Sequence, residues 1–308
     1  MRRPDPRLLI VINPGASRAE AALPQIVDWF EDRARVTLIV AHKKDELQRI
    51  LEAEGCKADR IVIGGGDGTL SKALPVLLDL KKPVATLPLG TANDFARTLG
   101  LPTDPLEAAK IAIEGREHKI DVGLANGRPY LNVASIGVAS AVIKSQSKAM
   151  KQRWRVLAYA ISLIRAVRDL QPFFVDLDID DGPSWSAPVY QVSIGNGRHH
   201  GGGLTVAEDA AIDDGKLHIY AVYPGTFWQL VACLTHLRFG MMKPTLLDRH
   251  TATRVVLRTR RPRAVDSDGR HTTDTPATFT LLPRSLTVIV PRALPETHRG
   301  LSSLSASA

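Results

Sequence analysis

The sequence predicts an α/β N-terminal domain followed by a second domain rich in antiparallel strands. Over residues 1–122, β-branched runs alternate with helix-like stretches, which is the pattern of a parallel sheet covered by helices. From about residue 118, strand-like runs and turn residues follow one another, which favours antiparallel pairing. With 308 residues, 44% of them hydrophobic, the chain has enough apolar material for two domains.

Each element is predicted from local patterns of apolar residues and turn residues. In the first domain the predicted strands are residues 7–12, 36–40, 60–63 and 84–87, and the predicted helices are residues 19–32, 45–54, 69–80 and 105–114. In the second domain the predicted strands are residues 129–133, 173–180, 188–194, 216–222, 254–258, 277–282 and 286–290, with helices at 152–170 and 226–239. Ligands of such α/β sheets bind beyond the carboxyl ends of the strands, so the residues there are candidates for a site.

Two glycine-bearing turns follow two of these strands. The segment IVIGGGDGT occupies residues 61–69, and PLGTANDF occupies residues 88–95. Glycine lets the main chain approach a ligand closely, and the freed N–H groups can converge on an anion. Asp67 then places a carboxylate where Mg²⁺ could bridge protein and phosphate. The two turns together predict a nucleotide site.

The commoner nucleotide motifs do not fit these turns. A Walker A loop needs Gly followed by Lys and then Ser or Thr, whereas here Lys72 follows Ser71. A dinucleotide-binding fingerprint that starts at Gly64 needs a third glycine where Thr69 stands. The remaining alternative is a glycine-rich turn without a ligand, and the second matching turn argues against it.

The two turns resemble those of the diacylglycerol kinase superfamily of lipid kinases, and most closely its bacterial YegS-like branch. The resemblance continues through NVASIG (132–137), GNGRHHGGGLTVA (195–207), DDGKL (213–217) and DSDGRHTTDTPATFTLLPRSLTVIVP (266–291). It implies a doubly wound, phosphofructokinase-like nucleotide-binding domain over residues 1–122 and a β-sandwich lipid-substrate domain over residues 123–286. Residues 287–293 would form a terminal strand that returns to the first domain. The tail, residues 294–308, is expected to be disordered.

The resemblance also implies which residues hold ATP and its Mg²⁺. They are Asn13, Gly65, Gly66, Asp67, Gly68, Thr69, Thr91 and Asn93, with Asp67 as the metal ligand at the phosphates. Considered by themselves, Asp67 and Thr91 can equally be residues that cap helices. Both interpretations place these side chains at the start of a helix.

A second Mg²⁺ is implied at the segment Asp213–Asp214–Gly215. By itself, an Asp-Gly pair between two strands predicts only a turn. The resemblance implies a structural ion held by the Asp214 side chain and by the backbone oxygens of Ala211 and Lys216. Carboxylate and carbonyl oxygens are the ligands that such a hard cation takes.

Asp268 is the predicted general base. Phosphoryl transfer to a hydroxyl needs a group that orients the hydroxyl and accepts its proton, and family members supply it from an Asp-Gly-Glu segment. Here the segment reads Asp268–Gly269–Arg270, and Arg270 could pair with Asp268 and lower its pKa, or could bind an anionic lipid or phosphate. Asp266 is the rival base, because residues two apart in a strand face the same side. Glu208 is a further departure, since the family usually has Pro there.

Charge and hydropathy limit the partners. Lys and Arg number 40 against 32 Asp and Glu, a formal charge of +8 that suits an anionic partner. No nucleic-acid module is present and only 5% of residues are aromatic, so we expect no nucleic-acid partner. No apolar run approaches the ~20 residues that cross a bilayer, so we expect a cytoplasmic protein peripherally associated with the inner face of the membrane. The basic stretch 144–155 suits either anionic headgroups or solvent.

Three functions compete. The preferred one is an ATP-dependent lipid kinase that phosphorylates a hydroxyl of diacylglycerol or a related lipid at the membrane surface. A second is an NAD kinase-like phosphotransferase, which shares a GGDGT-type loop. A third is a lipid or nucleotide sensor with impaired catalysis, supported only by Arg270 and Glu208. The PLGTANDF segment favours the lipid branch, and the sequence leaves a homodimer open.

Overall fold

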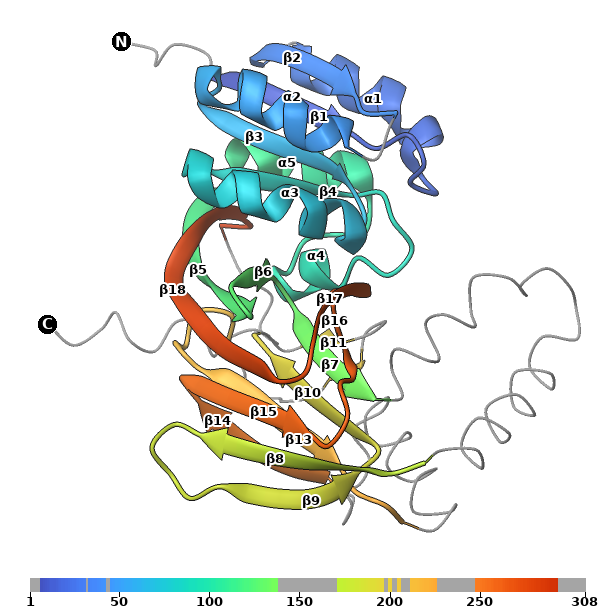
Figure 1. Ribbon diagram of the computed structural model, residues 1–308. Helices are drawn as coiled ribbons and strands as arrows, with labels where there is room; N and C mark the ends of the chain where they lie inside the picture. Colours follow the sequence, from blue (N-terminus) through green and yellow to red (C-terminus); the bar gives the residue numbers. More distant parts are fainter. Residues whose placement is uncertain are drawn as a thin grey trace, which may run out of the picture.

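The β-branched runs near the N-terminus form a parallel sheet. In the computed structural model, β1 (Arg7–Ile12), β2 (Arg35–Val40), β3 (Arg60–Gly65) and β4 (Val84–Pro88) pair in the order β2-β1-β3-β4, all of them parallel. The structure describes residues 6–31, 33–42, 45–137, 171–196, 199–200, 204–205, 211–225 and 247–292. Figure 1 shows this sheet and its helices stacked on a second body built of strands.

Helices cover both faces of the parallel sheet. One face packs against α1 (Ala19–Glu31) and α5 (Pro105–Glu114), and the other against α2 (Glu46–Glu54) and α3 (Asp67–Leu80). A short 3₁₀ turn, η1 (Gly55–Lys57), follows α2, and a short helix, α4 (Asp94–Thr98), follows β4. Each face therefore buries its own hydrophobic core, as expected for a doubly wound sheet.

The last strand, β18 (Ala277–Val290), joins the two bodies. Its second half lies between β4, which it pairs in parallel at Val288, and β5 (Arg116–Ala125), which it pairs antiparallel. Its first half pairs antiparallel with β15 (Arg254–Thr259), and it is the long curved red strand of Figure 1. The two stretches predicted at 277–282 and 286–290 are thus one strand, interrupted by an irregularity between Leu282 and Leu286.

The second body is a sandwich of two antiparallel sheets over one hydrophobic core. One sheet continues from β18 and β15 to β8 (Phe173–Ile179) and β9 (Trp185–Val189). The other runs in the order β14-β13-β10-β7-β16-β17, with the bounds Leu247–Ala252, Leu217–Val222, Gln191–Gly195, Val133–Gly137, Ala264–Ser267 and Arg270–Asp274. The short strand β6 (Arg128–Tyr130) pairs with β5, and β11 (His199–His200) and β12 (Leu204–Thr205) pair with each other as a separate two-stranded sheet.

The predicted fold class is confirmed, and the errors concern individual elements. The strand expected at 129–133 is two short strands, β6 and β7, which belong to different sheets. Strand β5 was missed because its first half alternates charged residues at the surface and only its second half is apolar. The helices expected at 152–170 and 226–239, the basic stretch 144–155, Glu208 and the tail 294–308 lie outside the described residues. Within the described ranges, no helix has the length and apolarity needed to cross a bilayer.

We expect Phe279→Ala to destabilise the fold because it empties a site at the centre of β18. Phe279 is fully buried in the sandwich core, opposite Val255 on one side and Ala125 on the other. The loss should be about 3–5 kcal/mol in the free energy of unfolding, measured by urea titration. Leu282→Ala is the matched control, because Leu282 lies on the same strand and is 36% exposed. Equal losses in the two variants would contradict this account of the core.

Candidate functional site

Three loops meet at the carboxyl edge of the parallel sheet. The Asn13 N–H, just after β1, donates to the Gly64 carbonyl oxygen (2.9 Å), and the Leu89 N–H, just after β4, donates to the Gly65 carbonyl oxygen (3.0 Å). The Asn13 side chain also reaches α3, where its Nδ2 donates to Thr69 Oγ1 (3.0 Å). The structure thus brings together the three predicted nucleotide loops.

The two glycine turns touch through their backbones. A Cβ added to Gly90 would lie 2.5 Å from the Gly66 Cα, and one added to Gly66 would lie 3.1 Å from the Gly90 Cα. Only glycine at both positions lets the loops approach so closely. In contrast, a Cβ on Gly68 would meet nothing within 4 Å, so Gly68 is not required for packing.

Asn93 shapes the second turn. Its backbone is left-handed (φ 51°), its Oδ1 accepts a hydrogen bond from the Gly90 N–H (3.0 Å), and its Nδ2 donates to the Gly90 carbonyl oxygen (2.8 Å). The expectation that Thr91 opens a helix is wrong, because α4 begins at Asp94 with Asn93 as its N-cap. Thr91 is exposed in the bend before that helix, where its hydroxyl is accessible to a ligand.

Asp67 is the first residue of α3, but its carboxylate caps a different helix. Its Oδ2 accepts a hydrogen bond from the Asp94 N–H (3.1 Å), and its Oδ1 accepts one from the Phe95 N–H (2.9 Å). The N-cap of α3 itself is Gly66. Burial raises the pKa of Asp67, and the Asp94 carboxylate adds to that rise against the effect of the two amides. Asp67 therefore joins the two glycine turns.

Asp268 lies in the hairpin turn between β16 and β17. Asp268 and Gly269 both have left-handed backbones (φ 48° and 77°), which is the conformation of a type I′ turn. The Asp268 carboxylate accepts hydrogen bonds from three consecutive N–H groups, those of Leu131 (2.8 Å), Asn132 (2.9 Å) and Val133 (3.2 Å). These bonds fix the orientation of the carboxylate.

The electrostatics of Asp268 link it to the nucleotide loops. Burial raises the pKa of Asp268 to about 6, against the three amide hydrogen bonds, and the negative charge of Asp67 adds to the rise. The two carboxylates are therefore close enough to interact. The expectation that Arg270 lowers this pKa is wrong, because Arg270 is exposed and, among the described residues, makes no contact with the carboxylate of Asp268.

Asp266 occupies a different environment from Asp268. It lies within β16 opposite Ser135, is 6% exposed, and its Oδ1 lies 3.7 Å from Nδ1 of His271. The prediction that the two aspartates face one side used strand periodicity, which does not extend to Asp268 in its left-handed turn. Asp268, and not Asp266, accepts the three amide hydrogen bonds.

The Asp214 turn is also organised by backbone N–H groups. Asp214 Oδ1 accepts from the Lys216 N–H (2.9 Å), and its Oδ2 accepts from the Ala211 N–H (3.3 Å) and lies 2.8 Å from Nε2 of His218. The residues predicted to surround a cation do converge here, through their amides. In the part of the chain that the structure describes, no three His, Cys, Asp or Glu side chains cluster as a metal site.

Asp121 supports this turn and was missed by the sequence analysis. It is 1% exposed, and its carboxylate accepts hydrogen bonds from the N–H groups of Gly215 (2.7 Å) and Arg284 (2.7 Å). Its backbone carbonyl accepts from Nδ2 of Asn196 (2.7 Å). One buried carboxylate thus joins β5, the Asp214 turn and the irregularity in β18. The available signal was an aspartate within the apolar run of β5.

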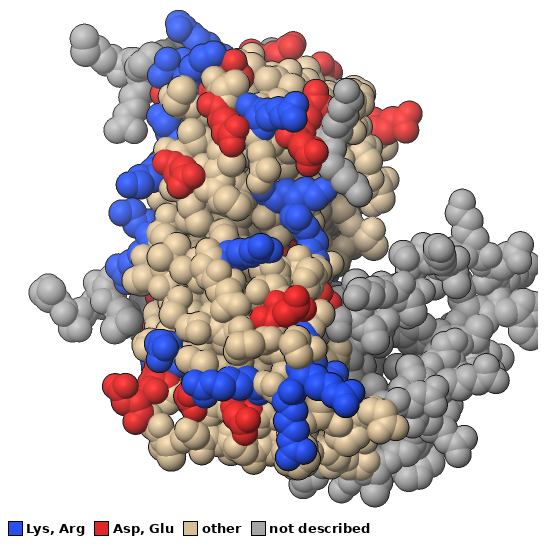
Figure 2. All heavy atoms as spheres, viewed as in Figure 1, with Lys and Arg blue, Asp and Glu red and all other residues tan. Residues whose placement is uncertain are grey.

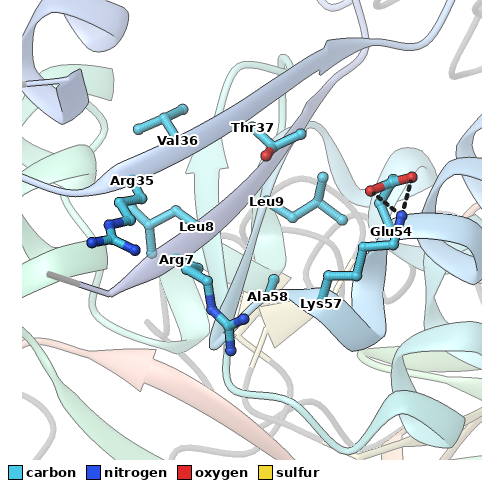
Figure 3. Close-up of a pocket in the computed structure, with 9 residues that line it drawn as sticks. All are labelled: Arg7, Leu8, Leu9, Arg35, Val36, Thr37, Glu54, Lys57 and Ala58. Carbon is cyan, nitrogen blue, oxygen red and sulfur yellow. Dashed lines mark hydrogen bonds and ion pairs between the residues drawn. The ribbon is translucent and has the colours of Figure 1, made fainter. Parts of the chain in front are cut away.

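The cavity in Figure 3 lies at the opposite edge of the parallel sheet. Its volume is ≈ 250 Å³, and its lining residues are Arg7, Leu8, Leu9, Arg35, Val36, Thr37, Glu54, Lys57 and Ala58. Lys57 Nζ lies 2.8 Å from Glu54 Oε1, and Arg7 Nη2 lies 2.9 Å from Asp59 Oδ1. Because these cations already have carboxylate partners and no predicted site residue lines the cavity, we assign it no ligand.

Two protein-family models match the chain in the order of its domains. The diacylglycerol kinase catalytic domain matches residues 7–125, and the YegS C-terminal NAD kinase beta sandwich-like domain matches residues 132–290. The predicted domain limits at 122 and 286 stay predictions. A diacylglycerol kinase structure from Bacillus anthracis strain Sterne aligns with a TM-score of 0.75 over 96% of this chain and 100% of that chain. At 23% identity, that likeness shows the fold.

The curated relatives are named as probable lipid kinases. A "Probable lipid kinase YegS-like" protein of Klebsiella pneumoniae (strain 342) is 31% identical over 222 residues, covering 70% of this chain and 73% of that protein. One of Chromohalobacter salexigens is 34% identical over 182 residues, covering 58% of each. The fold and the paired glycine turns define a kinase with a diacylglycerol kinase catalytic domain. The chain belongs to the YegS-like lipid kinases, and membership of a kinase family implies the use of ATP.

We expect Gly90→Ala to lower the free energy of unfolding by about 1–3 kcal/mol, because the new methyl group would force two backbones apart. The midpoint of thermal unfolding should fall accordingly. Gly68→Ala is the matched control, since its methyl group meets nothing within 4 Å, and its effect should stay within about 1 kcal/mol. Equal midpoints for the two variants would mean that the loops separate without cost.

Proposed function

We propose that this enzyme transfers the γ-phosphoryl group of ATP to a hydroxyl of diacylglycerol or a related lipid, with Mg²⁺ and with Asp268 as general base. One observation carries the proposal: the carboxylate of Asp268, from the second domain, is within electrostatic reach of Asp67 at the nucleotide loops. In-line transfer to an alcohol requires a base near the loop that binds the phosphates.

The nucleotide would bind where the three loops meet. Backbone N–H groups of the segment Gly65–Thr69 would face the phosphates at the start of α3, where the helix dipole favours negative charge. The hydroxyl of Thr91 and the amide of Asn13 lie on the neighbouring loops, and Asn93 holds the Gly90 turn in place. These contacts would position the phosphates through backbone amides and neutral side chains.

The residues at the loops suit a Mg²⁺ ion that also binds phosphate. Each oxygen of Asp67 accepts one amide hydrogen bond, which leaves a lone pair on each for a cation. Mg²⁺ usually takes one or two carboxylates and completes its shell with water and substrate phosphates, so a single Asp67 is a sufficient protein ligand. When bound, the ion neutralises charge on the phosphates. A structural ion at Asp214, with backbone oxygens of Ala211 and Lys216, remains a second part of the proposal.

Asp268 has the properties of a general base. Burial raises its pKa to about 6, so the carboxyl is deprotonated at neutral pH. Because this pKa is nearer to 7 than that of an exposed aspartate, the carboxylate is also the stronger base. The three amide hydrogen bonds would hold the carboxylate toward the acceptor, whose hydroxyl proton passes to a carboxylate oxygen as the oxygen attacks the γ-phosphorus. The acceptor would reach this base from a membrane, so we also propose a peripheral location at the cytoplasmic face.

The acceptor class can be tested directly. Incubation of the protein with radiolabelled ATP and Mg²⁺ should label a lipid when diacylglycerol and related lipids are offered as a panel, and should not label NAD. Labelled NAD would favour the NAD kinase-like alternative. ATP binding without transfer to any lipid or to NAD would favour the sensor.

The pH dependence of turnover should reflect the titration of Asp268. A carboxyl with a pKa raised to about 6 is protonated below that pH and cannot accept a proton, so turnover should rise as the pH increases through about 6. Asp268→Asn should lose this rise and lower kcat by on the order of 10²–10⁴, while ATP affinity stays near that of the wild type. Asp266→Asn, the control, should keep the rise. The reverse pattern would move the base to Asp266.

A further inference from the structure

Three exposed arginines lie together in the connection between β15 and β16. Arg260, Arg261 and Arg263 are all exposed, and none of them has a carboxylate partner among the described residues. The Arg260 guanidinium lies 4.6 Å above the ring of Phe174, and that of Arg263 lies 4.0 Å above the ring of Phe173. We call Arg260, Arg261, Arg263 and Phe174 the arginine–phenylalanine patch.

The patch carries positive charge that its neighbours do not compensate. The next arginine along the chain, Arg258, pairs with Asp178 on β8 (2.6 Å). Asp176, on the same face, accepts a hydrogen bond from the neutral Ser186 hydroxyl and keeps its negative charge, so the three arginines of the patch outnumber the one carboxylate without an Arg partner beside them. Figure 2 shows Lys and Arg side chains gathered across the second body, where β8 and β15 lie in Figure 1, with Asp and Glu beside them.

Phe174 makes this patch more than a charged surface. Buried and exposed residues alternate from Phe173 to Leu177, and Phe174 occupies an outward position in register with Asp176. It is 46% exposed, one of two large hydrophobic side chains of the described residues that are so accessible. Arg260 covers one face of the ring, which leaves at most one face for a stacked base.

We propose that the arginine–phenylalanine patch docks the enzyme on an anionic phospholipid bilayer. The arginines would bind lipid phosphates, for which a guanidinium is well shaped, and Phe174 would enter the headgroup region. This inference rests on the proposed function, because an acceptor held in a membrane requires the enzyme to bind there. A nucleic acid would match the charge, but Arg260 takes one of the two ring faces on which a base would stack.

The position of the patch relative to the site agrees with this role. Arg263 precedes β16 and Asp268 follows it, so the two lie at opposite ends of one four-residue strand. At ~3.3 Å per residue, they are separated by roughly 16 Å of backbone. Docking through the patch would therefore place the membrane about the length of this strand from the proposed base.

Vesicle binding of the full chain tests the docking surface. We would measure sedimentation with vesicles of phosphatidylcholine alone and of equimolar phosphatidylcholine and phosphatidylglycerol. The triple variant Arg260→Gln, Arg261→Gln, Arg263→Gln should bind the anionic vesicles on the order of a hundredfold more weakly than the wild type. Phe174→Ala should bind them about tenfold more weakly.

A charge-matched variant controls for net charge. Arg35→Gln, Arg49→Gln, Lys81→Gln removes three exposed cations from the first domain and should bind within about twofold of the wild type, because cations beyond a Debye length contribute little. Wild-type binding by the patch variant, or an equal loss in the control variant, would overturn the proposal. So would a patch variant that keeps vesicle binding but loses affinity for a single-stranded oligonucleotide.

Activity on a dispersed substrate separates this inference from the proposed function. The patch variant should phosphorylate a short-chain diacylglycerol in neutral detergent micelles at the wild-type rate, and lose activity only on anionic vesicles. If the wild type phosphorylates no lipid but binds vesicles through the patch, the docking surface is supported and the kinase reaction is rejected. Lipid phosphorylation with patch-independent vesicle binding would reject the surface alone.

Discussion

The geometry of the site depends on one strand that belongs to both bodies of the molecule. β18 lies between β4 and β5 at one end and pairs with β15 at the other. It is therefore hydrogen-bonded to strands of both bodies. The nucleotide loops leave the parallel sheet beside it, and residues 131–133, whose N–H groups hold Asp268, follow the β5–β6 hairpin and lead into β7. A strand shared in this way limits how far the two aspartates can separate without breaking a ladder.

One feature recurs at four acidic residues, namely a carboxylate that accepts hydrogen bonds from backbone N–H groups. Asp67, Asp121, Asp214 and Asp268 each accept two or more such bonds. Amide dipoles orient a carboxylate without neutralising it, unlike an Arg or Lys partner. Burial is the main cause of the raised pKa of Asp268, and the negative charge of Asp67 adds to that rise. Carboxylates held in this way suit the metal ion and nucleotide that we propose for the site.

The sequence predicted the features that depend on neighbouring residues alone. β-branched runs gave the parallel strands, and the glycine turns gave the loops that meet beyond them. The helix expected to begin at Thr91 begins instead at Asp94. Its first N–H groups donate to Asp67, which is distant in the sequence, so local patterns could not predict this start. The role of Asp121 depends on partners in two distant segments. The turn at Asp268–Gly269 does have a local signal, since Asp-Gly pairs favour type I′ hairpins. The expectation of an extended strand there overlooks it.

The position of Arg270 bears on whether this chain retains catalysis. A cation that paired with Asp268 would lower the pKa of its carboxyl and weaken it as a base. Instead, Arg270 begins β17 with an exposed side chain, while the carboxylate faces inward to the N–H groups of residues 131–133. Solvent screens an exposed charge, so burial and amide hydrogen bonds set the pKa of Asp268. The departure from the family's Glu thus leaves the proposed base intact and removes the main structural reason to expect a sensor.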